Sequence, residues 1–206
     1  ITHLINADKG YNDKDLLVVP MNYNERPVNG DDGELTGQGE RMMNLIKNEL
    51  SQNTNIEYVS GRSRGLNMTM MLSINEETGE RQQVRTFMQR AEPDFLKAME
   101  MEIIEGRDFD INNGETERDY IIVNQQFAKK MNWGDSVLGR RFGFNDNANQ
   151  VVGMVKDYNF QSLESEIDPI VINLRKDMPI GEVVVKFKEG TLSESLAAVE
   201  AAWEKF

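Results

Sequence analysis

The segment with the most suggestive chemistry runs from residue 108 to residue 119, where oxygen-bearing side chains recur at alternate positions. Asp108, Asp110 and Asn112 have the spacing of the first ligands of a calcium loop, whose oxygens converge on one hard cation. Counting Asp108 as the first position puts Asn113 where the loop needs glycine and Asp119 where it needs a bidentate glutamate. The segment is therefore predicted to be a solvated turn after a strand.

Three methionines are the next candidates, because thioether sulfurs bind Cu(I). In a strand, Met68 and Met70 point to one face and Met71 to the other, so the three sulfurs do not converge. The sequence holds 12 methionines, and such flexible side chains suit irregular packing or a pliable contact surface. We expect packing or surface contact rather than metal binding.

The sequence contains little evidence for a catalytic motif or for an anion-binding site. The two adjacent acidic pairs, Asp31-Asp32 and Glu76-Glu77, lie in polar segments and not in the apolar surroundings that raise a carboxyl pKa. No Walker-type Gly-Lys-Ser/Thr sequence occurs. Residues 61–65 could bind an anion in a backbone nest, but a turn between strands is the favoured interpretation. The sequence thus gives no support for catalysis.

Composition excludes several further classes. Twenty-three basic and 35 acidic residues give a net charge of −12, which argues against nucleic acid or anionic lipid as the main partner. The absence of cysteine excludes disulfides and thiolate catalysis, and the single histidine, His3, excludes multi-histidine metal sites. No apolar run is long enough to span a membrane. The start at Ile1, without an initiator methionine or a signal sequence, indicates an excised piece or a processed product.

Hydrophobic periodicity predicts an α+β chain with regular ends and a middle made of short elements. Alternating or β-branched runs predict strands, and apolar spacings of three and four predict helices. Asn22 to Gly39 is polar and glycine-rich, which predicts a loop. The predicted strands cover 16–21, 56–59, 68–74, 83–88, 103–104, 121–123, 141–144, 150–155, 170–174 and 182–187. The predicted helices cover 40–52 and 125–131, and two more begin at Glu92-Pro93 and after Thr191.

Three local signals position these elements. The connector 75–80 has hairpin-loop chemistry, with Gly79 free to take positive φ. Asn124 is the expected N-cap of the helix 125–131. Thr191 and Glu194 have the capping-box pattern, in which hydroxyl and carboxylate satisfy each other's backbone N–H groups. The apolar face of the helix that follows is expected to hold Leu192, Leu196, Val199 and Trp203.

The order of motifs between residues 101 and 174 resembles a known family. The motifs are 104–109 (IEGRDF), 121–128 (IIVNQQFA), 138–141 (LGRR), 151–163 (VVGMVKDYNFQSL) and 168–171 (DPIV). Together they resemble the extracytoplasmic domain of MacB/FtsX-like ABC-transporter permeases, especially the Bacteroidetes type. Residues 9–17 resemble the stretch that follows the first membrane helix of that family. Val137 and Gln125 stand where the family usually has proline and glutamate, which affects local element boundaries more than the assignment.

The resemblance implies an α+β fold in two parts. A porter-like βαβ-rich subdomain would comprise 1–90 and 168–206, with boundaries near Ala91 and Asp168, and a smaller sabre-like subdomain, 91–167, would be inserted in it. We expect the motif residues to shape the fold rather than to contact a ligand; Gly106 and Gly153 would allow close backbone approach, and the aromatics would anchor a connection between the subdomains. These residues are Gly106, Arg107, Asp108, Phe109, Asn124, Gly139, Gly153, Lys156, Asp157, Tyr158, Phe160 and Pro169.

The resemblance also implies a setting and a role. The chain would be the periplasmic domain of an inner-membrane permease, relaying ATP-driven motion of membrane helices to export or extraction of a substrate. It would have no catalytic, metal-binding or cofactor-binding residue, because ATP is used by a separate cytoplasmic ATPase. Its partners would be a second permease copy, that ATPase, and an adaptor protein in the periplasm. The alternatives are a stand-alone extracytoplasmic sensor or ligand-binding module of the same fold and, further off, a hydrolase with buried carboxylates.

Overall fold

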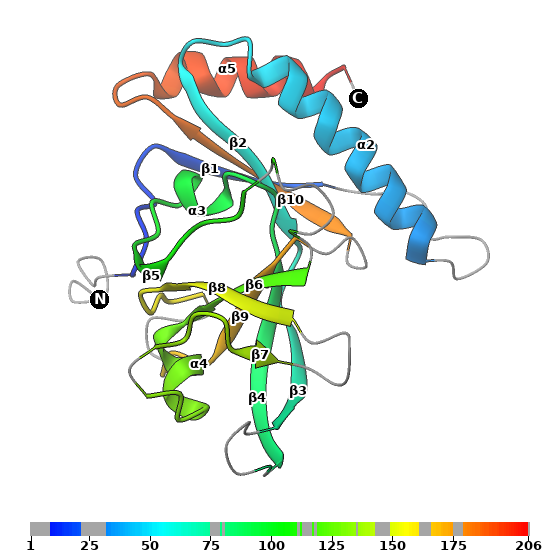
Figure 1. The fold of residues 1–206 in the computed structure, drawn as a ribbon. Coiled ribbons are helices and arrows are strands. Elements are labelled where there is room, and N and C mark those ends of the chain that lie inside the picture. Colours follow the sequence, from blue (N-terminus) through cyan, green and yellow to red (C-terminus); the bar gives the residue numbers. More distant parts are fainter. Residues whose placement is uncertain are drawn as a thin grey trace. The chain divides into compact units, whose positions relative to one another are not determined.

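The computed structural model describes residues 9–21, 32–74, 79, 81–110, 112, 117, 119–134, 136–142, 149–160, 166–174 and 179–205. These residues form a mixed α/β fold with two sheets and four helices (Figure 1), which confirms the expected α+β class. The strands are β1 (Leu16–Pro20), β2 (Ile56–Ser63), β3 (Asn67–Ile74), β4 (Arg81–Arg90), β5 (Ile103–Gly106), β6 (Tyr120–Asn124), β7 (Arg141–Phe142), β8 (Asn149–Val155), β9 (Ile170–Asn173) and β10 (Ile180–Phe187). The helices are α2 (Asp32–Leu50), α3 (Phe95–Ala98), α4 (Gln125–Lys130) and α5 (Leu192–Trp203).

The smaller sheet is antiparallel, in the order β1-β10-β2, and its central strand is buried along most of its length. Val183 and Val185 of β10 belong to a core that includes Ile46 of α2 and Val199 of α5. Because side chains alternate across a strand, Val184 and Lys186 point to the opposite face. Val184 is nevertheless as fully buried as Val183 and Val185, so both faces of β10 are covered along this valine run.

The larger sheet has the order β3-β4-β9-β6-β8-β5, with β7 also paired to β8. β6 and β8 are parallel, whereas β5 and β7 pair with β8 in antiparallel fashion. The amphipathic α4 covers one face, where Phe127 packs with Ile121, Val123 and Val151. The predicted hairpin across residues 75–80 is confirmed, because β3 pairs with β4. Gly79 has φ 70°, as expected, but the rest of the connector 75–80 apart from this glycine lies outside the described residues.

The chain divides into two compact units, each made of separate segments. One comprises Ile1–Tyr11, Leu66–Gln89 and Met101–Leu174, and the other Asn12–Gly65, Arg90–Glu100 and Arg175–Phe206. These ranges differ from the expected boundaries, chiefly because the hairpin β3–β4 joins β9 in the larger sheet. The link is direct: Phe87 N–H and the Thr86 hydroxyl both donate to the Pro169 carbonyl, at 2.9 and 3.1 Å. Which unit corresponds to a porter-like or a sabre-like subdomain stays a prediction.

Two elements begin earlier or extend further than expected. The predicted glycine-rich loop is wrong from Asp32 onward, because α2 starts there. Burial of Met43, Ile46 and Leu50 against the sheet outweighs the cost of about 1 kcal/mol that each glycine adds to a helix. The predicted turn at 61–65 is also wrong in part, since β2 continues to Ser63 and pairs with β10. Residues 61–63 therefore form no anion nest.

The start of α3 and the cap of α5 differ from the predictions, although α5 begins directly after Thr191 as expected. Near Glu92-Pro93 the helix begins at Phe95, with Asp94 as N-cap. The capping box at Thr191 is wrong: its hydroxyl donates to the Lys188 carbonyl at 2.7 Å instead of accepting from the Glu194 amide. The backbone of Thr191 (φ −105°, ψ 18°) lies outside the extended region that this cap requires.

The expected apolar face of α5 needs correction at Leu192. Leu192 is 53% exposed, and the buried residues of α5 are Ser195, Val199 and Ala202. Likewise Leu45 of α2 is 50% exposed, whereas Met43 is buried. In the part of the chain that the structure describes, no helix is both long and apolar enough to cross a membrane.

Candidate functional site

The family-motif residues meet around the strands β5, β6, β8 and β9, and we call their meeting place the junction. At its centre Gly106 of β5 pairs with Gly153 of β8. A Cβ atom on Gly106 would come closer than 3.0 Å to the Val152 carbonyl oxygen, and one on Gly153 closer than 3.0 Å to the Arg107 carbonyl oxygen. Gly106 also has φ 77°, where residues with a side chain are strained. The two backbones therefore approach each other as only glycine permits.

Arg107, Asp108 and Phe109 form the turn that leaves β5. The Arg107 guanidinium donates to the Glu117 carboxylate at 2.6 Å and lies over the Tyr120 ring, 5.4 Å from its centroid. The hydrogen bond to Glu117 raises the pKa of Arg107. Glu117 is only 1% exposed and also accepts from the Asp110 N–H at 2.8 Å. The ion pair between Arg107 and Glu117 was not predicted from the sequence, because no local pattern distinguishes a buried glutamate from an exposed one in a polar loop.

Asn124 connects three segments of the junction. It is fully buried, and its Oδ1 accepts from the N–H groups of Phe127 and Ile170 at 3.1 and 3.0 Å. Its Nδ2 donates to the Asp168 carbonyl at 3.0 Å. The predicted N-cap is thus confirmed, and the same side chain also ties the start of α4 to the Asp168-Pro169 turn before β9.

Asp157 supplies a second cap to α4 from a distant part of the chain. Its carboxylate accepts from the Gln126 N–H at 2.9 Å, while its own N–H donates to the Gln125 side-chain oxygen at 3.1 Å. Gln125 therefore keeps the oxygen acceptor that a glutamate would offer here. Burial raises the pKa of Asp157, and the hydrogen bonds from Gln126 and Gln125 oppose this rise. The result is the reciprocal pattern of a capping box, made between two segments.

The raised pKa of Asp157 predicts a pH-dependent effect of Asp157→Asn. The Asp157 carboxyl binds a proton more tightly in the folded chain than in the unfolded chain. Its protonation therefore stabilises the fold fully below the ordinary pKa of 3.8, and this stabilisation is lost as the pH rises through the raised pKa. Asparagine keeps an acceptor without the charge. The free energy of unfolding of the variant, relative to that of the native chain, should therefore increase as the pH rises from about 3 to 7. The increase should be less than about 1 kcal/mol, because the carboxyl is only partly buried.

Urea unfolding of both chains across this pH range measures the difference. Asp119→Asn is the matched control, because it makes the same substitution at an exposed position. A flat difference for Asp157→Asn would contradict the raised pKa.

Aromatic rings form a row beside the junction. Tyr158 is buried and packs edge-on against Phe160, whose centroid lies 5.4 Å away, and Phe160 packs on Phe87 at 5.5 Å. Tyr11 meets Tyr158 at 6.5 Å, and the Asn159 N–H donates to the Lys9 carbonyl at 2.8 Å. The row therefore ties residues 9–11 and β4 to the segment after β8, all within one unit.

The remaining motif residues hold the turns around β8. Gly139 has φ 76° and donates its N–H to the Val151 carbonyl at 2.9 Å, and the Lys156 N–H donates to the Glu102 carbonyl at 2.9 Å. The Val137 N–H donates to the Glu105 carboxylate at 3.4 Å. The proline that the family usually has at this position would lack that N–H.

The other chemical candidates do not assemble into a site. Among the described residues, no three histidine, cysteine or acidic side chains group as metal ligands. The calcium-like stretch is described only in part, since residues 111, 113–116 and 118 lie outside the described residues, as do Asp31, Glu76, Glu77 and His3. Met71 packs toward the core, whereas Met68 and Met70 are exposed. This divergence confirms that the three sulfurs do not converge.

A groove of about 860 Å³ lies next to the junction, between α4 and the turn before β9. Its lining combines the cations Lys129 and Lys130 with the anions Glu166 and Asp168, and amide side chains and the apolar Ile167 and Pro169 complete it. Such a mixed lining favours no single class of ligand.

These contacts define an α/β domain in which the motif residues hold distant backbone segments together. Comparison with known proteins gives the family: the chain belongs to the MacB-like periplasmic core domain family, whose model matches residues 6–204. The resemblance inferred from the motifs is therefore confirmed. No curated protein matches the sequence.

Two solved structures share the fold. The periplasmic region of MacB from Actinobacillus actinomycetemcomitans is similar with a TM-score of 0.60 at 14% identity, covering 97% of this chain and 87% of that one. The extracellular domain of the noncanonic ABC-type transporter YknZ from Gram-positive bacteria is similar with a TM-score of 0.52 at 14% identity, covering 86% of each chain. At these identities the likeness concerns the fold alone.

Proposed function

We propose that this chain is the periplasmic domain of an inner-membrane ABC-transporter permease and relays ATP-driven motion of membrane helices to the export or extraction of a substrate. Membership of the MacB-like periplasmic core domain family supports the transporter context. In this proposal the domain has no catalytic activity and no cofactor, and ATP is hydrolysed by a separate cytoplasmic ATPase. Its partners are that ATPase, a second permease copy, and an adaptor protein in the periplasm, but no nucleic acid.

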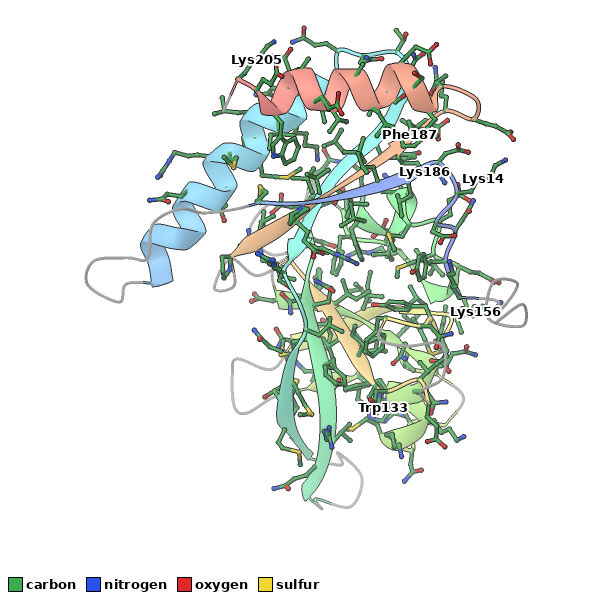
Figure 2. All side chains as sticks on the ribbon, turned by 180° about the vertical axis from the view of Figure 1, so that it is seen from behind. Lys14, Trp133, Lys156, Lys186, Phe187 and Lys205 are labelled. Atoms are coloured by element: carbon green, nitrogen blue, oxygen red, sulfur yellow. The ribbon has the colours of Figure 1, made fainter. Side chains whose placement is uncertain are left out.

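The observation that carries the relay is a set of contacts between the segment before β1 and strand β10. Lys186 of β10 is buried, and its Nζ donates to the Lys14 carbonyl at 2.8 Å and pairs with the Glu100 carboxylate at 2.6 Å. The other Glu100 oxygen accepts from the Asn12 side chain at 2.7 Å. We call Asn12, Lys14, Glu100 and Lys186 the Lys186 clasp; Figure 2 labels Lys14 and Lys186 next to Phe187.

The clasp has the properties of a rigid connection. Two residues of this region take positive φ: Glu100 (49°) and Asp15 (53°), which follows Lys14 in the sequence. Such a conformation persists only where surrounding contacts enforce it. The hydrogen bonds from Lys186 and Asn12 lower the pKa of Glu100, so the carboxylate stays ionised over a wide pH range. The Phe187 N–H also donates to the Asp15 carbonyl at 3.0 Å. Displacement of residues 12–15 would therefore be carried to β10, which leads directly into α5.

The test is Lys186→Met in the full-length permease with its ATPase, measuring ATP hydrolysis and substrate export in the same membranes. We expect export per ATP to fall while ATP hydrolysis persists, because methionine fills the space without holding the segment before β1. Because Lys186 is buried and the variant loses its contacts with Lys14 and Glu100, export is normalised to the folded permease recovered from the membrane. Lys205→Met is the matched control, since Lys205 pairs with Glu49 at an exposed site.

Unchanged export per ATP in Lys186→Met would contradict a relay through the clasp. A gene that encodes no membrane helices and lies near no ATPase would favour the alternative, a stand-alone sensor or ligand-binding module. In that case the groove beside α4 is the first place to look for a ligand.

A further inference from the structure

The outward face of the hairpin β3–β4 exposes an unusual combination of side chains. Met68 and Met70 are 53% and 58% exposed, although Met71 of the same strand packs toward the core. Across the hairpin, Met68 is opposite Phe87 and Met70 is opposite Arg85. Since opposite residues in an antiparallel pair share a face, these four side chains form one surface, which we call the Met–Arg face.

The composition of the Met–Arg face is that of a contact surface. Methionine, arginine and aromatic residues are enriched at the centres of protein interfaces, whereas lysine and acidic residues are depleted there. The chain as a whole has a net charge of −12, yet none of these four residues is acidic. Flexible thioether side chains adapt to irregular apolar partners, and adjacent exposed large apolar residues on one hairpin are uncommon without a role.

The face also has a rigid base. Phe87 packs edge-on against Phe160, and Phe160 packs against the buried Tyr158. The Arg85 guanidinium is exposed and contacts the Met68 sulfur. Within the described part of the chain the side-chain partner of Arg85 is the Met68 sulfur, and no carboxylate pairs with it. An exposed cation in an apolar setting is thus held in place and open to an anionic group.

We propose that the Met–Arg face docks a peptide segment of another protein, one that brings apolar side chains on either side of a carboxylate. The apolar side chains would cover the two methionines and Phe87, and the carboxylate would pair with Arg85 in a charge-assisted hydrogen bond. A second copy of this chain fits less well, because a two-fold contact would bring two Arg85 side chains together without a carboxylate among the four residues. An anionic membrane is disfavoured by the net charge of −12.

This inference does not depend on a transport role, and it can be tested on the 206-residue chain. A displayed library of random peptides is selected against the immobilised chain, and selected peptides are measured by calorimetry. We expect them to share apolar residues around an aspartate or glutamate. The double variant Met68→Ser/Met70→Ser and the single variant Arg85→Glu should each bind them roughly tenfold more weakly or worse. Peptides with the acid changed to lysine should bind Arg85→Glu better than the native chain.

Leu45→Ser is the matched control, since Leu45 is 50% exposed on α2 and should not affect binding. Urea unfolding shows whether each variant is folded, which these exposed positions should permit. Three outcomes would overturn the proposal: no selected peptides, peptides whose binding survives the methionine double variant or Arg85→Glu, or a chain that sediments as a dimer and becomes monomeric in the methionine variant. The last outcome would make a second copy the occupant of the face.

Discussion

Asn124→Ala is expected to lower the free energy of unfolding by about 3 to 4 kcal/mol. Asn124 is fully buried and makes three hydrogen bonds, accepting from Phe127 and Ile170 and donating to Asp168. Alanine leaves two buried N–H groups and one carbonyl without this partner, and each unsatisfied group costs about 1 to 3 kcal/mol, less where water enters. Loss of the N-cap of α4 is part of the same cost.

Graded variants separate the capping function from the connection between segments. Asn124→Ser can still cap α4 but is too short to reach both Ile170 and Asp168, so we expect about half the loss. Asn48→Ala is the control, because Asn48 is exposed within α2 and alanine is the better helix former. Urea unfolding measures the free energy of unfolding of these three variants. A loss below about 1 kcal/mol for Asn124→Ala would mean that its hydrogen bonds are not formed or are replaced by water.

Gly106→Ala is the second change with a large expected effect, a loss of about 3 kcal/mol or more. Two physical costs add at this position. The φ of 77° places a Cβ atom in the left-handed region, which costs about 1 to 2 kcal/mol. The Cβ would also meet the Val152 carbonyl oxygen, which cannot withdraw without weakening its 3.0 Å hydrogen bond from the Arg107 N–H.

Two other glycines allow the costs to be measured one at a time. Gly134 has φ 66° but open space around the position of a Cβ atom, so Gly134→Ala should lose only about 1 kcal/mol. Gly153 lacks positive φ but would place its Cβ against the Arg107 carbonyl, so Gly153→Ala measures the steric cost alone. If Gly106→Ala were no more destabilising than Gly134→Ala, the close approach of β5 and β8 would be disproved.

The elements themselves were largely predictable, because their signals are local. Strand runs such as 121–123, the N-cap Asn124 and the turn glycine Gly79 depend on the conformational preferences of neighbouring residues. Failures occurred where packing outweighed those preferences. The glycine-rich start of α2 is helical because its continuation is buried, and Thr191 does not cap α5 because its backbone takes another conformation.

The junction was predictable as a set of residues but not as a set of contacts. The motif order named Asn124, Asp157 and Pro169, and the structure brings them to the start of α4 and the turn before β9. Glu117 and the Lys186 clasp carried no sequence signal at all. Buried and exposed residues alternate little along β10, so the pattern does not single out Lys186. The Lys14 carbonyl to which Lys186 donates is 172 residues away in the sequence.

By itself, the sequence determined the α+β class, the family and the exclusion of cysteine and multi-histidine chemistry, because composition, periodicity and motif order are properties of the chain read along its length. The tertiary structure decided which strands pair, that the hairpin β3–β4 joins β9 in the larger sheet, and that methionines 68 and 70 stay exposed. The physical reason is that pairing and burial depend on contacts between segments far apart in the chain, whose free energy no local pattern contains.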